Sequence, residues 1–282
     1  FRSAARRSRT SSRILSRPFL VDNVGKVDNV MSEPVLANYV VERLRRPPSV
    51  PQIVAGSTPV LSFGNPSTAT VATLGLNPSR QEFLDKDGRE LTGAARRFET
   101  LASLGVSSLT SASSEAMQRV VSACNRYFQV NPYRRWFDQF EPILTSVGAS
   151  YYAGSACHLD LVQWATDPVW GTLKDRGLQD QLLAKDAGFL RQQLVTGVFR
   201  LLLINGTGVS QVFERAFGLT LRPAGHVVDA SVTARLSVGR LPFGTRVIAW
   251  SVNLQSSFGV TNVLRAALAH RVAALSQEGA VI

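Results

Sequence analysis

Residues 70–79 read TVATLGLNPS, and this stretch indicates the fold class of the chain. Positions 70–76 are apolar or β-branched on both alternating faces, which is typical of a strand buried on both sides of a parallel sheet. The strand is expected to end at Asn77-Pro78-Ser79, because Asn and Pro favour a turn. The sequence therefore predicts a buried strand that runs directly into a polar loop.

Three further apolar segments predict strands of the same kind, at residues 155–162, 199–204 and 246–251. Helical patterns lie around and between them, at residues 34–46, 113–129, 179–197, 209–217 and 262–275. Pro47-Pro48 ends the first helix and Thr261 is a candidate N-cap of the last. Buried strands that alternate with helices predict an α/β fold with a central parallel four-stranded sheet and helices on both faces. The Pro-, Gly- and Ser-rich residues 47–69 are expected to form a loop.

The composition excludes several classes of protein. Of the 282 residues, 45% are hydrophobic and 18% are charged, which suits a chain with a full core rather than a disordered one. No run of about 18 apolar residues occurs, so no membrane-spanning segment is expected. Cys124 and Cys157 are too few for a disulfide framework, a structural zinc site or an iron–sulfur cluster. We expect no metal or cofactor, and a reducing, cytoplasmic location.

Basic charge is spread unevenly along the chain. Lys and Arg number 31 against 20 Asp and Glu, and residues 1–30 hold seven of the basic residues against two Asp. We expect residues 1–30 to form a basic disordered extension and residues 31–282, which begin at Met31, to form a single domain. A targeting peptide or a nucleic-acid-binding arm are the alternatives for the extension. The basic excess in the remainder favours a polyanionic partner.

Polar side chains follow each of the four predicted strands. They are Asn77 and Ser79 after the first strand, His158, Asp160 and Gln163 at the end of the second, Asn205 after the third and Asn253 after the fourth. In parallel α/β sheets, ligands bind beyond the carboxyl ends of the strands. We therefore expect these side chains to converge on one rim of the sheet and to form a functional site.

The order of these motifs resembles that of the uracil-DNA glycosylase superfamily. Its first motif is a strand that ends in Gly-x-Asn-Pro, as in Gly75–Pro78, and its last is a strand followed by a short polar loop, as in residues 253–259. Arg97-Phe98-Glu99 is similar to an Arg-Phe-aromatic stretch of mismatch-type members, and Gly206 follows the third strand. The resemblance covers about residues 70–265. It implies a monofunctional, monomeric and DNA-associated DNA repair enzyme, which hydrolyses the N-glycosidic bond of deoxyuridine in single- or double-stranded DNA, releases uracil and leaves an abasic site.

The resemblance also implies roles for individual residues. The catalytic pair would be Asn77, which orients the attacking water, and Asn253, which hydrogen-bonds uracil O2. The substrate-binding residues would be Leu76, Pro78, Ser79, His158, Asp160, Gln163 and Asn205. The residues inserted into DNA as the nucleotide flips out would be Leu254, Gln255, Ser257 and Phe258.

The chain departs from the family pattern in three ways, which would make it an atypical member. The last loop has no Pro, the four cysteines of the cluster-containing members are absent, and Asp160 stands where the family has a base-reading Asn. Uracil offers an N3–H donor beside an O4 acceptor, and an ionised carboxylate only accepts. Asp160 would therefore have to be protonated by burial, or be helped by a backbone N–H, His158 or Gln163.

Other interpretations of the same residues stay open. Asn77-Pro78 could be only a turn, Asp160 a paired core carboxylate, and Leu254 and Phe258 core side chains. At the level of function, the alternatives are a non-catalytic nucleic-acid-binding module of the same fold, or a hydrolase of small nucleosides or esters. The absence of a Gly-x-Ser-x-Gly elbow disfavours an esterase.

Overall fold

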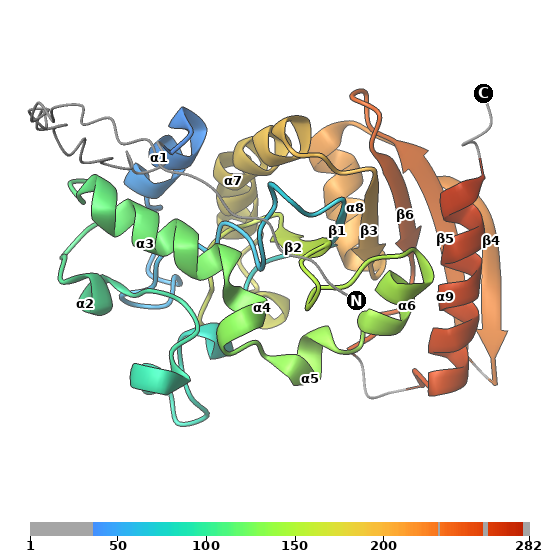
Figure 1. The fold of residues 1–282 in the computed structure, drawn as a ribbon, viewed down its shortest axis with the longest axis horizontal. Coiled ribbons are helices and arrows are strands. Elements are labelled where there is room, and N and C mark those ends of the chain that lie inside the picture. Colours follow the sequence, from blue (N-terminus) through green and yellow to red (C-terminus); the bar gives the residue numbers. More distant parts are fainter. Residues whose placement is uncertain (1–35, 231, 256–258, 279–282) are drawn as a thin grey trace, which may run out of the picture. The chain divides into compact units, whose positions relative to one another are not determined.

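The computed structural model describes residues 36–230, 232–255 and 259–278, and residues 36–282 belong to one compact unit. The expected extension, residues 1–30, lies outside the described residues. A six-stranded sheet in the order β2-β1-β3-β6-β5-β4 is the centre of the fold (Figure 1). Its strands are β1 (Val71–Gly75), β2 (Ala156–Asp160), β3 (Leu201–Asn205), β4 (Arg222–Asp229), β5 (Val232–Arg240) and β6 (Arg246–Trp250).

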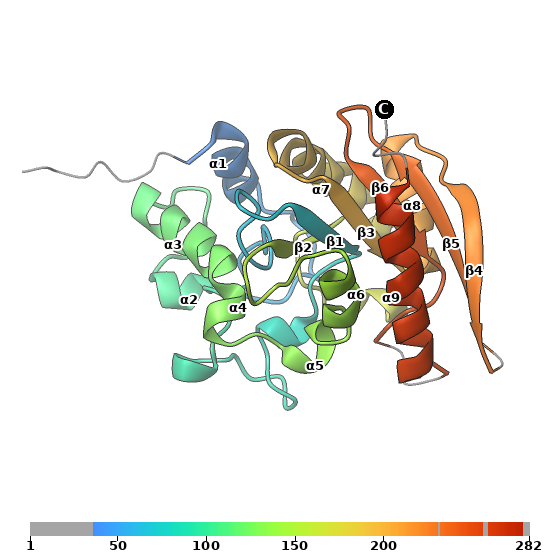
Figure 2. The same cartoon turned by 45° about the vertical axis from the view of Figure 1, so that its right-hand side comes forward.

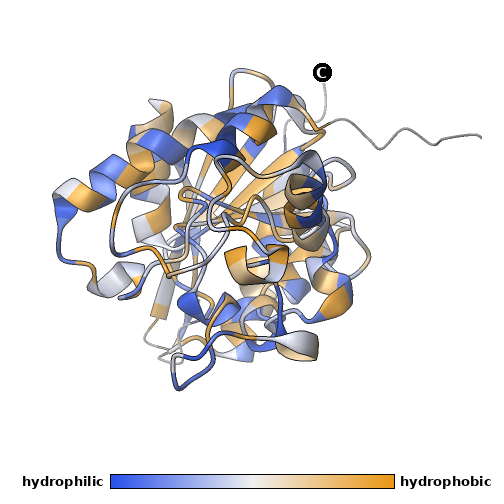
Figure 3. Ribbon diagram, turned by 90° about the vertical axis from the view of Figure 1, so that its left-hand side faces the viewer, coloured by the Kyte–Doolittle hydropathy of each residue, from blue (hydrophilic) through white to orange (hydrophobic). Residues whose placement is uncertain are grey.

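The four predicted strands are β1, β2, β3 and β6, and they pair in parallel. Their alternating side chains enter apolar clusters on opposite faces, so both faces are buried as the sequence indicated. Figure 3 shows hydrophobic residues concentrated on these central strands. The register places Gly75 of β1 directly beside Asp160 of β2, at the carboxyl ends of the two strands.

The prediction of a sheet with four strands, all of them parallel, is wrong in the number of strands and in the orientation of the added ones. An antiparallel hairpin, β4–β5, adds two strands beside β6 and makes the sheet mixed. β4 is an edge strand whose residues are mostly exposed, and its pairing is irregular between Pro223 and His226. Pro is tolerated only at sheet edges and bulges, and an exposed edge needs no continuous apolar run. The hairpin therefore lacks the pattern by which the buried strands were found.

Helices cover both faces of the sheet, as expected. On one face lie α7 (Arg176–Thr196) and α8 (Thr207–Phe217), and on the other lie α6 (Glu141–Ser146) and α9 (Asn262–Gln277) (Figure 2). The face of α6 also carries α3 (Ser114–Asn125), α4 (Tyr127–Val130) and α5 (Arg134–Phe137). The remaining helices are α1 (Asn38–Arg45), the short α2 (Leu101–Leu104) and single 3₁₀ turns at Arg80–Glu82, Gly93–Ala95 and Trp170–Thr172.

The helix predictions are confirmed with shifted ends. The helix expected at 113–129 is broken at Arg126 into α3 and α4. Thr261 caps α9, because its side chain accepts a hydrogen bond from the backbone N–H of Leu264 at 3.0 Å. None of the helices in the described residues is long and apolar enough to cross a membrane.

The segment expected to be a loop at residues 47–69 is largely irregular, yet much of it is buried. Phe63 exchanges two backbone hydrogen bonds with His158, both of 2.9 Å, and so covers the outer edge of β2. This pairing protects an edge that a parallel sheet would otherwise expose. It also brings the Phe63 ring to the end of the sheet where polar side chains were expected to gather.

Candidate active site at the carboxyl ends of the parallel strands

A pocket of about 470 Å³ opens beyond the carboxyl ends of β1 and β2. It is lined by the predicted residues Asn77, Pro78, Ser79, His158, Asp160 and Asn253, and by Phe63, Glu82, Tyr133, Trp136, Phe137, Val169, Trp170 and Gly171. Its volume is in the range of small-molecule sites. The structure therefore brings six of the predicted site residues together, although they come from three distant parts of the chain.

The side chain of Asn77 is held in one orientation. Its Nδ2 donates to the backbone carbonyl of Trp164 at 3.1 Å and to Oγ1 of Thr166 at 3.2 Å. A carbonyl can only accept, so the amide nitrogen must face it. The Oδ1 atom of Asn77 is thus left as the group that this side chain can offer to a bound molecule, and Oδ1 can only accept a hydrogen bond.

The side-chain amide of Asn253 is held by its oxygen, whereas that of Asn77 is held by its nitrogen. Its Oδ1 accepts from the backbone N–H of Gln255 at 3.0 Å and from Nδ2 of Asn205 at 3.1 Å. Because the backbone N–H can only donate, the Nδ2 group of Asn253 is the one left for a ligand. The pocket is therefore lined by one amide that presents an acceptor and by one that presents donors.

Asn205 does not line the pocket but positions the loop that does. Its Oδ1 accepts from Nε1 of Trp250 and from the backbone N–H of Leu254, and its Nδ2 donates to Asn253 and Gln255. All of its hydrogen-bonding capacity is used within 3.1 Å. Asn205 was predicted to contact the substrate, but in the structure it instead holds the loop that carries Asn253.

Asp160 reaches the pocket through a close approach of β2 to β1. A Cβ atom on Gly75 would lie 2.4 Å from Oδ1 of Asp160, so only glycine leaves room for this carboxyl group. Within the described structure, neither carboxylate oxygen has a hydrogen-bond partner, and Nε2 of His158 lies 3.3 Å from Oδ1. A buried polar group without a partner is costly, which indicates an atom reserved for a ligand.

His158 is fixed from its other side by a buried chain of hydroxyl groups. Its Nδ1 lies 2.7 Å from Oγ1 of Thr73, which in turn lies 2.5 Å from the hydroxyl of Tyr151. All three residues are at most 2% exposed. This chain holds the imidazole ring against Asp160 and makes His158 part of the pocket floor.

Glu82 is a pocket residue that the sequence interpretation missed. It ends the 3₁₀ turn that follows Ser79, is 3% exposed, and its Oε2 accepts from the Tyr127 hydroxyl at 2.9 Å. Burial raises the pKa of Glu82 to about 7, and the charge of Asp160 adds to the rise, while Arg97, 3.9 Å away, and Tyr127 oppose it. Its place in the loop directly after a buried strand is the signal that could have indicated it.

The raised pKa of Glu82 makes the stability of the protein depend on pH. The ordinary pKa is 4.5, so the folded chain favours the neutral form of Glu82. The stabilising contribution of neutral Glu82 to the free energy of unfolding is complete below about pH 4.5 and is lost as the pH rises through about 7. We expect Glu82→Gln to stabilise the protein at alkaline pH by on the order of 3 kcal/mol relative to wild type. Urea unfolding at pH values on both sides of 7 measures this, and an equal effect at all pH values would contradict it.

Aromatic rings form the walls of the pocket. Phe63, Trp136 and Phe137 pack against His158 with ring centroids between 5.0 and 5.5 Å apart. Tyr133 and Trp170 line the same space. The position of Trp136 and Trp170 suits contact with a planar ring.

Comparison with protein-family models and with curated proteins finds no match to this chain. Over the described part of the chain, no group of three or more His, Cys, Asp or Glu side chains is arranged to hold a metal ion.

Two other predicted substrate contacts do not line the pocket. Leu76 packs against two apolar clusters. Gln163 is buried behind the pocket, where its Nε2 donates to the backbone carbonyl of Asp160 rather than to the carboxylate. Its Oε1 accepts from Arg43 of α1, and Arg43 forms a buried ion pair with Asp186 of α7. This network supports the segment that carries Asp160.

The predicted DNA-inserting residues are placed only in part. Leu254 is fully buried in the main core cluster, so the prediction that it projects into DNA is not met in this structure. Gln255 is half-buried and its side chain is bonded to Asn205 and to the Trp136 carbonyl. Ser257 and Phe258 lie outside the described residues.

Leu254→Ala is expected to destabilise the fold by about 3 kcal/mol, because it leaves a cavity in a closed core. Val263→Ala is the matched control, since Val263 is 67% exposed nearby and its truncation should cost little. Chemical unfolding measures both. If Leu254→Ala keeps wild-type stability and loses activity only on double-stranded DNA, the side chain acts on DNA and not in the core.

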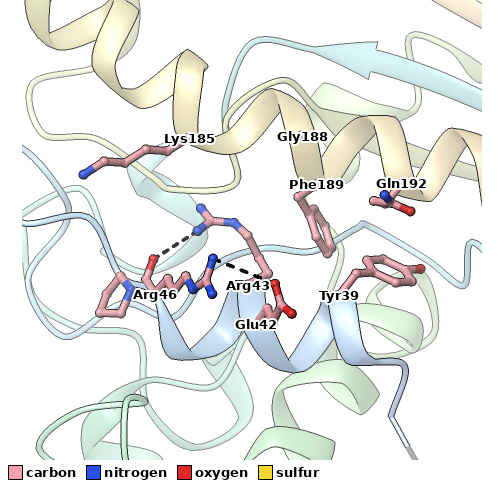
Figure 4. A pocket seen from close by; sticks show the side chains of 9 residues that line it. Tyr39, Glu42, Arg43, Arg46, Lys185, Gly188, Phe189 and Gln192 are labelled. Atoms are coloured by element: carbon pink, nitrogen blue, oxygen red, sulfur yellow. Dashed lines mark hydrogen bonds and ion pairs between the residues drawn. The ribbon is translucent and has the colours of Figure 1, made fainter.

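A second pocket, of about 600 Å³, lies between α1 and α7 (Figure 4). Three of its four charged side chains have partners: Arg43 pairs with Asp186 and donates to the Arg46 backbone carbonyl, and the Arg46 side chain lies 3.8 Å from Glu42. The walls include the rings of Tyr39 and Phe189. Among the described residues that line this second pocket, none has a buried side-chain polar atom without a hydrogen-bond partner, whereas Asp160 in the first pocket has two.

Proposed function

We propose that this protein is a DNA glycosylase that removes uracil from DNA, and that it is an atypical relative of the uracil-DNA glycosylase superfamily without an iron–sulfur cluster. One observation carries the proposal, namely the opposite orientation of two amides in one aromatic-walled pocket. Asn77 offers an acceptor and Asn253 offers donors. Hydrolysis of the N-glycosidic bond needs an acceptor for the attacking water and a donor for the departing base.

The reaction suits a group such as Asn77. As the N-glycosidic bond lengthens, positive charge develops on the sugar and negative charge on uracil, so the water needs to be positioned more than deprotonated. An amide oxygen can accept a hydrogen bond from water but does not titrate in this range. The free Nδ2 group of Asn253 would donate to uracil O2, where the negative charge develops. The sp² rings of the pocket wall would hold the flipped base by stacking.

The rim of the pocket suits a phosphate backbone. Trp136 and Phe137 of α5 line the pocket, and the preceding residues of the same helix, Arg134 and Arg135, are exposed. Arg134 lies over the Tyr152 ring at 4.4 Å and 3.6 Å from Asp138. Cationic side chains beside the opening would contact phosphates without reading sequence. The net charge of +11 acts in the same direction.

A direct assay tests the function. The purified chain is incubated with an oligonucleotide that contains a single uracil, in single-stranded and in double-stranded form, and alkali then cleaves any abasic site. We expect cleavage at the uracil position only. If the chain shifts the oligonucleotide in a gel at low salt but produces no alkali-labile site, the non-catalytic nucleic-acid-binding alternative holds instead.

A further inference from the structure

Two carboxyl groups from separate segments lie in the same pocket. Glu82 comes from the turn after β1 and Asp160 from the end of β2, and they are 3% and 4% exposed. Both oxygens of Asp160 are buried without a hydrogen-bond partner in the described structure. A second negative charge in one buried site is costly, so the charge of Asp160 favours the protonated form of Glu82.

The contacts of Glu82 decide where that proton can sit. The Tyr127 hydroxyl accepts from the backbone N–H of Tyr133 at 2.9 Å and donates its own hydrogen to Oε2 of Glu82. Oε2 is therefore occupied as an acceptor, and a proton on Glu82 belongs on Oε1. A neutral Glu82 thus has an O–H group to donate to a bound molecule.

The surroundings favour Glu82 as the protonated member of the pair. Arg97 Nε lies 3.9 Å from Oε2 of Glu82, but this Nε donates to the Asn131 carbonyl at 3.2 Å and Nη1 donates to the Gln81 carbonyl at 2.5 Å. Burial and the charge of Asp160 outweigh its attraction, so the pKa of Glu82 rises to about 7. Nε2 of His158 lies 3.3 Å from Oδ1 of Asp160, so a hydrogen on that nitrogen would face an acceptor.

We propose that Glu82 and Asp160 together read the edge of the substrate base, with Glu82 donating to a ring carbonyl and Asp160 accepting from the adjacent ring N–H. This inference rests on the proposed function, and it deepens it by naming Glu82 as a specificity residue. The ligand class is a base with a lactam edge, in which N–H stands beside C=O. The pair supplies the donor and acceptor that an ionised Asp160 alone cannot supply to uracil.

Binding of free bases tests the pair without any need for catalysis. The full chain is titrated with 1-methyluracil, 1,3-dimethyluracil and 1-methylcytosine below about pH 7, with the fluorescence of the pocket tryptophans as the signal. We expect 1-methyluracil to bind at least about 10-fold more tightly than either of the others, because the second methyl group removes the remaining ring N–H and cytosine reverses both groups. Equal affinities, tighter binding of 1-methylcytosine or no binding of any base would overturn the proposal.

Variants of Glu82 identify its part. Glu82→Ala should weaken binding of 1-methyluracil about 10-fold or more, and Glu82→Gln should restore most of it, because an amide N–H can replace the carboxyl O–H. Glu99→Gln is the matched control, since Glu99 is paired with Arg119 and does not line the pocket. Equal losses in the Ala and Gln variants, at melting temperatures that show both are folded, would overturn the donor role.

The outcomes separate this inference from the proposed function. If the wild-type chain prefers 1-methyluracil as expected but leaves uracil in DNA intact, the base-reading pair stands and the glycosylase proposal fails. If the chain excises uracil and Glu82→Ala keeps the wild-type preference for uracil over cytosine, the glycosylase proposal stands and the pair fails.

Discussion

Asn77→Ala is expected to lower the single-turnover rate of uracil excision by about 10²-fold or more, with little change in DNA affinity. Because Nδ2 of Asn77 is bonded to the protein, its Oδ1 would be the acceptor for the attacking water in the proposed reaction, whereas phosphate contacts at other positions would provide the binding energy. Rapid-quench kinetics at saturating enzyme measure the rate, and a gel shift measures the affinity.

Asn131→Ala is the control for this prediction. Asn131 also uses its side-chain amide to hold a backbone carbonyl, that of Ala95 at 2.9 Å, but it does not line the pocket. If the loss of an amide that holds a backbone carbonyl were enough to slow excision, both variants would be equally slow. If Asn131→Ala is as slow as Asn77→Ala, or if a folded Asn77→Ala excises uracil at the wild-type rate, Asn77 does not position the water.

Arg43→Ala and Asp186→Ala are each expected to destabilise the fold by about 3 to 5 kcal/mol. The two side chains are 6% and 0% exposed and lie 2.7 Å apart, so removing one leaves the other as a buried, uncompensated charge. Burial outweighs the attraction between them, since it raises the pKa of Asp186 and lowers the pKa of Arg43. Urea unfolding curves measure the loss.

The same network predicts how related variants behave. Arg46→Ala is the control at the end of the same helix, because the Arg46 side chain is 78% exposed and its loss should cost little. Arg43→Met combined with Asp186→Leu should lose less stability than the two single variants together, since no charge is left unpaired. Additive losses would show that packing, and not charge compensation, dominates at this position.

The sequence by itself determined the parallel part of the sheet and most helices. Burial on both faces requires apolar residues at both parities, and this local pattern is visible in residues 70–76 without any knowledge of their neighbours. Because ligands of parallel sheets bind beyond the carboxyl ends of the strands, Asn77, Asp160 and Asn253 were also identified as pocket residues. The β4–β5 hairpin was not predicted, because an exposed edge strand with Pro and Gly has no such apolar pattern.

Only the tertiary structure decided what each polar side chain does. Asn205 and Gln163 resemble Asn77 and Asp160 in their position after a strand, yet their partners turn them into supports of the site. Leu254 follows a strand in the same way and is closed into the core. Glu82 enters the pocket because Tyr127, 45 residues away in sequence, fixes its carboxyl group. The hydrophobic periodicity of a sequence indicates which residues are buried. The hydrogen-bond partners of a polar side chain depend on which distant segment packs beside it, and only the tertiary structure determines that.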